Sequence, residues 1–240
     1  MDINPIYIIP ARGGSKGIPH KNIKELCGRP LIHYAIANAL ELASPGTHKR
    51  VIVSTDDPRI AEVALAAAAD ITIRRRPAAL ATDTAATQDV IIDAMDYAEG
   101  LGIAYDCVVL LQPTSPLREA ADIRRGLEMY AGADGGCDMV VSVCPSEANP
   151  YYDLMECDGD GYLHVSKGDG RYTRRQDAPP VWQYNGAVYV INPQAVRTTP
   201  MLKMRRRLPL AMDAGRSIDL DTPRDWAAAE TLINELRQRQ

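Results

Sequence analysis

Short apolar runs alternate with stretches of helical periodicity along most of this chain, and this alternation limits the folds that it can adopt. The pattern predicts strands at residues 6–9, 51–54, 71–73, 107–111, 139–143, 187–191 and 208–212. Helices are predicted at residues 31–42, 59–69, 87–100, 122–129 and 222–236. Strands that are separated by helices form parallel βαβ units. We therefore expect an α/β fold with a three-layer, doubly wound, mostly parallel sheet.

The alternation breaks between residues 145 and 180, where Gly, Asp, Pro, Tyr and Arg are frequent and periodicity is weak. A long irregular stretch inside a compact domain is usually functional, disordered or an inserted subdomain. A chain of 240 residues is long enough for one large α/β domain. We expect a single domain over residues 1–240, from which an excursion at about 145–185 protrudes.

The charge balance argues against nucleic acid as the main partner, because 27 Lys and Arg face 31 Asp and Glu. An anionic substrate must then be held by local clusters of cations. The five cysteines are odd in number and show no CxxC spacing, which favours reduced thiols over disulfides or a zinc site. No apolar run is long enough for a membrane span and no signal peptide pattern opens the chain. We expect a cytoplasmic protein with no membrane partner.

A loop rich in glycine and positive charge follows the first predicted strand directly. Gly13 and Gly14 allow main-chain N–H groups to turn towards one point. The cations beside them are Arg12, Lys16 and Lys21, and the neutral donors are Ser15 and Asn22. Cations with converging amide donors are the chemistry of a polyphosphate cradle, and open α/β sheets bind ligands at this end of a strand. The alternative is a solvated loop in which Arg12 and Lys21 form surface salt bridges.

Two common phosphate-binding patterns are absent from this loop. The sequence contains neither GxxxxGK[ST] nor GxGxxG after the first strand. The cradle therefore belongs to another class of nucleotide-binding loop.

Asp219 and Asp221 are the sharpest pair of candidate metal ligands. Only Leu220 separates them, so in an extended segment both carboxylates point to one side. Two hard oxygen ligands at that spacing suit Mg²⁺ that is bound jointly with substrate phosphates. The alternative is that Asp221 only caps the helix predicted after it, and the two roles can coexist.

ARGGSKGIPHKN, residues 11–22, resembles the nucleotide-binding loop of the acylneuraminate cytidylyltransferases, also called CMP-sialic acid synthetases. The likeness recurs in order along almost the whole chain. The matching pieces are STDD (54–57), RPAALATDTAAT (76–87), LLQPTSPLR (110–118), RRQD (174–177), YNGAVY (184–189) and SIDLDTPRDW (217–226). By this combination the chain is identified as a member of the family's bacterial single-domain type, which implies a nucleotide-diphospho-sugar transferase-like fold.

The resemblance also implies roles for particular residues. The nucleotide is expected on Ala11, Arg12, Gly13, Gly14, Ser15, Lys16, Lys21, Asn22, Arg76, Ala85 and Thr87. The sugar is expected on Gln112, Arg175, Gln176, Tyr184 and Asn185. Catalysis is expected to rest on Arg12, Lys21, Asp219 and Asp221. For Gln112 a turn-stabilising amide remains the alternative reading. In family members the region around residues 174–177 reaches across a homodimer and completes the neighbour's site, so the excursion is expected to be a dimer arm.

The implied activity is the activation of a nonulosonic acid, an acidic nine-carbon sugar, with CTP to give the CMP-sugar and pyrophosphate. Mg²⁺, or alternatively Mn²⁺, would bridge the phosphates from Asp219 and Asp221. The sugar would be of the N-acetylneuraminate or legionaminate type rather than pseudaminate. Some relatives carry Arg where this chain has Gln183, which bears on the contact with the sugar carboxylate. The sequence leaves open the particular sugar, the general base, the number of metal ions, and dimer against tetramer.

Two other functions stay open on the residues alone. One is a glycosyltransferase of similar fold, against which the basic loop counts, because a departing triphosphate end needs more positive charge. The other is a catalytically inactive nucleotide-sensing subunit, against which the intact Lys21, Asp219 and Asp221 count.

Overall fold

The computed structural model describes residues 3–14 and 17–238. In this part of the chain a central sheet of seven strands has the order β11-β7-β10-β6-β1-β4-β5. The strands are β1 (Pro5–Pro10), β4 (Val51–Thr55), β5 (Thr72–Arg75), β6 (Cys107–Leu110), β7 (Met139–Pro145), β10 (Trp182–Ile191) and β11 (Arg207–Ala211). β10 runs antiparallel to both of its neighbours, and the other pairings are parallel. The expected mostly parallel α/β sheet is confirmed.

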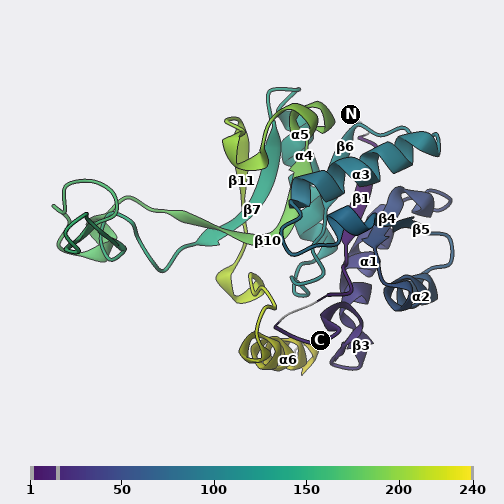
Figure 1. Ribbon diagram of the computed structural model, residues 1–240, viewed down its shortest axis with the longest axis horizontal. Coiled ribbons are helices and arrows are strands. Elements are labelled where there is room, and N and C mark those ends of the chain that lie inside the picture. Colours follow the sequence, from purple (N-terminus) through teal and green to yellow (C-terminus); the bar gives the residue numbers. More distant parts are fainter. Residues whose placement is uncertain (1–2, 15–16, 239–240) are drawn as a thin grey trace.

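Helices cover both faces of this sheet (Figure 1). The larger helices are α1 (Leu31–Leu42), α2 (Pro58–Ala67), α3 (Thr87–Gly100), α4 (Ala120–Gly132), α5 (Pro193–Thr198) and α6 (Pro223–Gln238). Tyr7 and Ile9 of β1 pack in the core beneath α1, α2 and α4. Ile6 and Ile8 point the other way and pack beneath α3 and α5. Because side chains alternate along a strand, β1 contributes to both cores, and the three-layer architecture follows.

β10 begins five residues earlier than the apolar pattern predicts. Its first part, from Trp182 to Tyr184, pairs with Val143 to Pro145 of β7 beyond the edge of the main core. Side chains are exposed there, so no buried period marks the strand in the sequence. The register then shifts between Tyr184 and Tyr189, at a bulge that contains Gly186 with φ of 73°. Glycine adopts this left-handed conformation without the strain that a Cβ brings.

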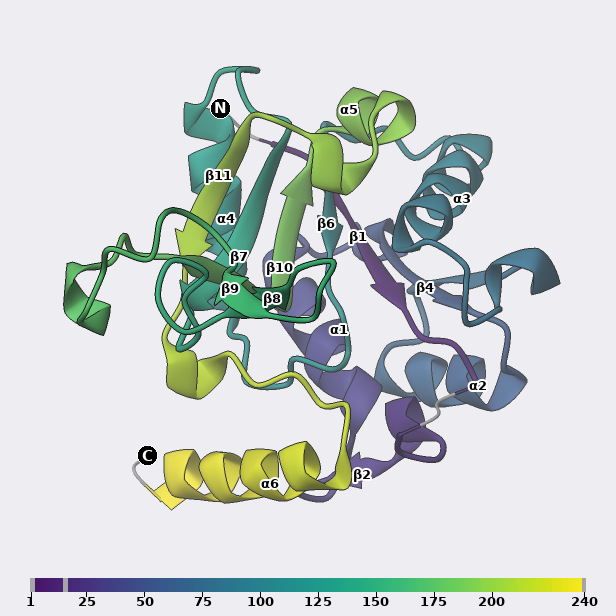
Figure 2. The ribbon, with the colours of Figure 1, turned by 60° about the vertical axis from the view of Figure 1, so that its left-hand side comes forward.

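Residues 146–181 form an arm that projects away from the sheet on the two-stranded stem of β7 and β10 (Figures 1 and 2). Inside the arm, β8 (Met155–Cys157) and β9 (Leu163–Val165) pair as a hairpin that the weak periodicity does not predict. Large apolar side chains are exposed on it, including Tyr162 at 73% and Leu163 at 69%. An arm of this kind at this position matches the expected excursion.

Helix α6 lies at one end of the molecule and packs on a small core of its own (Figure 2). Trp226 and Ile233 of α6 meet Leu26, in the hairpin of β2 (Glu25–Leu26) and β3 (Arg29–Pro30), and Leu31, which directly follows this hairpin. Lys24 Nζ lies 4.5 Å from the centre of the Trp226 ring. This core fastens the last helix to the segment that follows the glycine-rich loop.

Several single-turn elements complete the described chain. The 3-10 helices are η1 (Lys21–Ile23), η2 (His48–Arg50), η3 (Ala78–Leu80), η4 (Arg175–Asp177), η5 (Met201–Lys203) and η6 (Ala214–Arg216). The five cysteines are free thiols. A search of the described residues finds no helix with the length and apolar character that a membrane crossing requires.

Truncation of Trp226 tests the small core beneath α6. Trp226 is 5% exposed, so Trp226→Ala leaves a cavity and is expected to lower the free energy of unfolding by about 3–5 kcal/mol. Urea denaturation followed by circular dichroism measures this change. Leu236→Ala, at a half-exposed position of the same helix, is the control and is expected to change stability by less than about 1 kcal/mol. Equal effects of the two substitutions would contradict this account.

Candidate active site

A cavity of about 390 Å³ opens at the carboxyl ends of β1 and β6, beside the N-terminus of α3. We call it the first cavity. Its walls are Pro10, Arg12, Gly17, Lys21, Asn22, Arg76, Leu80, Thr82, Asp83, Ala85, Thr87, Val90, Gln112, Pro113, Thr114 and Asp221. This is the end of the strands at which open α/β sheets bind their ligands.

The loop after β1 is held in place by groups from neighbouring elements. Ala11 N donates to Ser54 O at 2.9 Å, and Gly13 N donates to Asp56 Oδ1 at 3.0 Å. The Asn22 amide donates to Arg12 O at 2.9 Å. Asn22 therefore lines the cavity and also fixes the course of the loop. Of the other predicted loop residues, Gly14 is exposed, and Ser15 and Lys16 lie outside the described residues.

Both expected cations of the described loop line the first cavity, and each meets a carboxylate there. Arg12 Nη1 lies 2.5 Å from Asp83 Oδ1. Lys21 Nζ donates to Leu220 O at 2.6 Å and to Asp221 Oδ1 at 3.1 Å. The Lys21 side chain is 14% exposed and that of Asp221 is 72% exposed, so the ammonium sits deep and the carboxylate stands at the rim.

Backbone contact also joins the loop to Asp221. A Cβ at Gly17 would lie 2.1 Å from Asp221 O, a distance that only a glycine avoids without backbone movement. The loop and the segment of Asp221 therefore touch directly, and position 17 requires glycine for close approach rather than for an unusual φ.

The Asp221 side chain is not used to cap α6. Thr222 and Asp225 do this, since Asp225 N donates to Thr222 Oγ1 at 3.3 Å and Thr222 N donates to Asp225 Oδ2 at 2.7 Å. The Asp221 carboxylate is left at the cavity with Lys21. The sequence left open that Asp221 caps this helix, but Thr222 does so instead.

Asp219 lies two residues before Asp221, and both residues retain an exposed surface. Burial raises the pKa of the Asp219 carboxyl, a hydrogen bond from Thr114 opposes the rise, and the charge of Asp221 adds to it. The two carboxylates are close enough to interact. Among residues 3–14 and 17–238 no group of three or more His, Cys, Asp or Glu side chains is arranged to hold a metal. Two carboxylates fit a divalent cation that takes further oxygens from phosphates and water.

Arg76 forms part of the buried wall of the first cavity. Its Nη2 donates to Ser54 O at 2.7 Å and its Nε donates to Ser54 Oγ at 3.2 Å, while burial lowers the pKa of the guanidinium. Ala85 and Thr87 of the same predicted segment also line the cavity. Leu80, Thr82 and Asp83 join them, although residue-by-residue reasoning gave them no site role. Their place within the motif at 76–87 was the sequence signal that could have predicted a role in the site.

A second cavity of about 390 Å³ shares Thr87 and Gln112 with the first. Its other walls are Ala86, Gln88, Leu110, Met139, Tyr184, Tyr189, Pro200, Met201 and Leu202. Gln88 braces this wall, since its amide donates to Val196 O and Thr199 O and accepts from Met201 N. Sequence reasoning named Gln112 and Tyr184 but missed the apolar residues, because separate segments supply them and no local pattern marks them.

The other predicted sugar-binding residues line neither cavity of the same chain. Arg175 and Gln176 are in η4 of the arm, where Arg175 donates to Glu147 O and, at 2.6 Å, to Asp153 Oδ2. Asn185 is buried and bonded to internal partners. Gln183 is exposed on the stem of β10. Direct sugar contacts of Arg175, Gln176 and Asn185 stay predictions.

A mostly parallel sheet whose strand ends carry a cation-lined cavity and a pair of aspartates is typical of α/β enzymes. The fold is similar to those of two solved structures. A CMP:2-keto-3-deoxy-manno-octonic acid synthetase complexed with CTP matches with a TM-score of 0.70 at 18% identity, over 97% of this chain and 99% of that chain. A 4-diphosphocytidyl-2C-methyl-D-erythritol synthase matches with a TM-score of 0.64 at 15% identity.

Residues 6–195 match the sequence model of the cytidylyltransferase family, and the chain belongs to this family. A relative from Legionella pneumophila named CMP-N,N'-diacetyllegionaminic acid synthase is 33% identical over 234 residues, which cover 97% of each chain. An N-acylneuraminate cytidylyltransferase of Streptococcus agalactiae is 34% identical over 93% of this chain and 52% of the relative. The resemblance stated from the motifs is confirmed.

The raised pKa of Asp219 predicts a gain in stability when its charge is removed. A carboxyl whose pKa is higher in the folded than in the unfolded state opposes folding once it ionises, so its cost grows as the pH rises through the two pKa values. Asp219→Asn is therefore expected to raise the melting temperature at pH 8 and to have little effect near pH 3. Scanning calorimetry at both pH values measures this. A lower melting temperature at pH 8 would contradict it.

Proposed function

We propose that this chain is a CMP-nonulosonate synthetase, which joins CMP from CTP to the anomeric 2-hydroxyl of a nonulosonic acid and releases pyrophosphate. The observation that carries the proposal is the adjacency of two unlike cavities that share Thr87 and Gln112, one lined by cations and the other mostly by apolar side chains. The relative that matches over 97% of both chains is named for a reaction product of this kind, which supports the proposal.

CTP would occupy the first cavity. Arg12 and Lys21 would neutralise the charge that develops on the phosphates. Main-chain N–H groups of the glycine-rich loop would add donors, apart from those of Ala11 and Gly13, which bond to Ser54 O and Asp56 Oδ1. The pyrimidine would lie against residues 76–87, with Ala85 and Thr87 at its edge. Arg76 would shape this end of the cavity from its buried position on Ser54.

Asp219 and Asp221 would hold a divalent cation, Mg²⁺ or Mn²⁺, because carboxylate oxygens are the hard ligands that these ions prefer. When bound, the cation would supply positive charge beside the phosphates. Lys21 would keep the Asp221 carboxylate turned to the cavity, where it lies 3.1 Å from the ammonium. Asp221 is the candidate to accept the proton of the attacking hydroxyl, and accurate positioning would supply much of the rate enhancement.

The sugar would occupy the second cavity. Met139, Tyr189 and Leu202 offer apolar surface that suits the methyl groups of acylated or deoxygenated positions. Gln112, at the border of both cavities, offers an amide for sugar hydroxyls or amides. These features fit sugars of the N-acetylneuraminate or legionaminate type. The reaction would take place in the cytoplasm, where CTP is available.

We also propose that the protein is a homodimer whose arms complete the sites of the partner. The arm exposes the large apolar side chains of Tyr162 and Leu163, which a contact with a second protein chain would cover. Arg175 and Gln176 lie on this arm, outside both cavities of their own chain. In a dimer they would reach the partner's second cavity, where an arginine provides a bidentate contact for the sugar carboxylate.

Pyrophosphate release tests the proposed reaction. With CTP, Mg²⁺ and a panel of nonulosonic acids, turnover is expected with at least one sugar, and Asp221→Ala is expected to lower kcat/KM by roughly 10²-fold or more. The release of inorganic pyrophosphate is followed by a coupled enzyme assay. Asp70→Ala, an exposed carboxylate next to the opposite end of β5, serves as the control.

The outcomes separate the proposed reaction from its rivals. Release confined to CTP with one acidic sugar, retained by the control, supports the synthetase. CTP binding without release for any sugar would instead support a nucleotide-sensing subunit. Turnover of a nucleotide sugar without pyrophosphate would support a glycosyltransferase.

Mixing two inactive variants tests the shared site. Asp221→Ala removes a cavity residue and Arg175→Ala removes an arm residue, so a mixed dimer keeps one intact site. After the two proteins are unfolded and refolded together, the mixture is expected to recover about a quarter of the wild-type activity, because about half of the dimers are mixed. Separately refolded samples that are then assayed are the control. No recovery in the mixture, with light scattering showing dimers, would place Arg175 outside the partner's site.

A further inference from the structure

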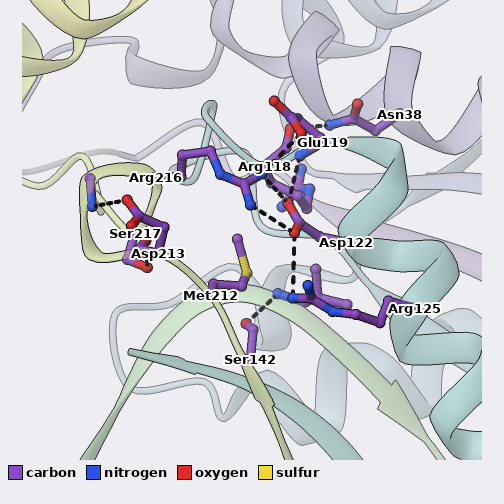
Figure 3. A network of polar contacts seen from close by, with 12 residues as sticks. Asn38, Arg118, Glu119, Asp122, Arg125, Ser142, Met212, Asp213, Arg216 and Ser217 are labelled. Atoms are coloured by element: carbon purple, nitrogen blue, oxygen red, sulfur yellow. Dashed lines mark hydrogen bonds and ion pairs between the residues drawn. The ribbon is translucent and has the colours of Figure 1, made fainter. Parts of the chain in front are cut away.

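The segment that carries both aspartates of the site, residues 213–221, contains no strand and only the single turn of η6. Its position therefore depends on side-chain and backbone bonds to the rest of the domain. Leu220 N donates to Thr114 O at 2.9 Å near the end that bears Asp219. At the other end of the segment, a network of polar side chains holds it to the rest of the domain (Figure 3).

Arg216 contacts two carboxylates in this network. Its Nη1 lies 2.8 Å from Asp122 Oδ2 and 3.1 Å from Glu119 Oε2, and its Nη2 donates to Asp122 Oδ1 at 3.2 Å. The Asp122 side chain is 2% exposed. A two-pronged contact between an arginine and a carboxylate fixes direction as well as distance. In Figure 3, Arg216 reaches across from η6 to both carboxylates at the start of α4.

Asp122 is itself immobilised. Its Oδ2 accepts the backbone N–H of Glu119 at 3.1 Å, as part of the capping box that begins α4. The turn before this helix holds Arg118, whose Nη1 donates to Gln112 O at 3.1 Å and to Ala187 O at 2.7 Å. The anchor of Arg216 thus lies in the first turn of α4, directly after the turn in which Arg118 bonds to Gln112 O.

A second bond holds the segment from the side of β10. Ser217 Oγ accepts from the Asn185 amide at 2.8 Å, and Asn185 Oδ1 accepts from Ser142 Oγ of β7 at 2.5 Å. The adjacent Gly186 shows how close the site lies. A Cβ built there would be 3.6 Å from Gln112 Oε1 and 3.7 Å from Asp219 Oδ2. Gln112 and Asp219 are therefore neighbours across one small space.

We propose that Arg216, through its ion pair with Asp122, is a positioning residue that sets the location of Asp219 relative to Gln112. The proposal rests on the proposed function, in which Asp219 holds a divalent cation and Gln112 contacts the sugar. Arg216 lines neither cavity, so it would act through the segment that it anchors. Asp219 follows Arg216 by three residues. Because no helix or strand lies between them, a shift of Arg216 is expected to shift Asp219 as well.

The test compares two substitutions of Arg216 with one substitution of an arginine in another ion pair. Arg216→Lys keeps the charge and loses the two-pronged contact, whereas Arg216→Gln loses both. Arg206→Gln is the control, since Arg206 also pairs with an aspartate, Asp138, at 2.6 and 3.0 Å, and lines neither cavity. The readouts are Mn²⁺ affinity in the presence of CTP, measured by electron paramagnetic resonance, and kcat with separate KM values for CTP and sugar.

Arg216→Gln is expected to weaken Mn²⁺ binding by about 10–100-fold and to lower kcat, while the KM for CTP changes by less than about threefold. Arg216→Lys is expected to lie between it and the wild type, and Arg206→Gln to match the wild type. If Arg216→Gln fails to fold, Arg216→Lys and the double variant with Asp122→Asn carry the test, because the double variant leaves no unpaired buried charge.

The proposal is overturned if folded Arg216 variants bind Mn²⁺ and turn over as Arg206→Gln does. It is also overturned if they show only a lower melting temperature, with Mn²⁺ affinity and kcat unchanged. Failure of the proposed function gives a different result, namely a wild type that binds Mn²⁺ and CTP but releases no pyrophosphate. The Mn²⁺ affinities of the variants still decide the role of Arg216 in that case.

Discussion

The two-sided burial of β1 is the constraint on which the rest of this structure depends. Ile6 and Ile8 are buried on one face and Tyr7 and Ile9 on the other, each at most 2% exposed. β1 pairs in parallel with both β4 and β6, which places three strand ends beside one another. The glycine-rich loop follows β1 at that place. The apolar residues of β1 that pack in the two cores therefore also determine where Arg12 lies, in the wall of the first cavity.

The elements that the sequence predicts are those whose buried residues form either an apolar run or one apolar face. β1 and β6 are apolar runs, and α3 shows one apolar face, so each was expected near its observed place. The first half of β10 and the hairpin of β8 and β9 were not expected. Their side chains are largely exposed, and the pairing that forms them lies between segments of the arm and its stem. Backbone pairing without a buried face leaves no mark that periodicity can detect.

The candidate site divides in the same way. Arg12, Lys21 and Asp221 were predicted because charge and glycine beside a buried strand carry a recognisable chemistry, and the structure brings them to one cavity. Met201 and Leu202 were missed, because an apolar residue shows no function until the fold places it beside Gln112. Asn185 illustrates a third case, since its motif predicts a sugar contact whereas its bonds to Ser142 and Ser217 hold the framework.

The bond between Lys21 and Asp221 joins residues that are 200 positions apart. After Lys21 has left the ribosome, almost the whole remaining chain must therefore be synthesised before Asp221 is present. During that interval the glycine-rich loop has no Asp221 backbone against Gly17 and no α6 core beside the hairpin of β2 and β3. Contacts of such long separation form late and slowly. Nascent and C-terminally truncated chains can thus bury much of the sheet while the first cavity still lacks the wall that Asp221 provides.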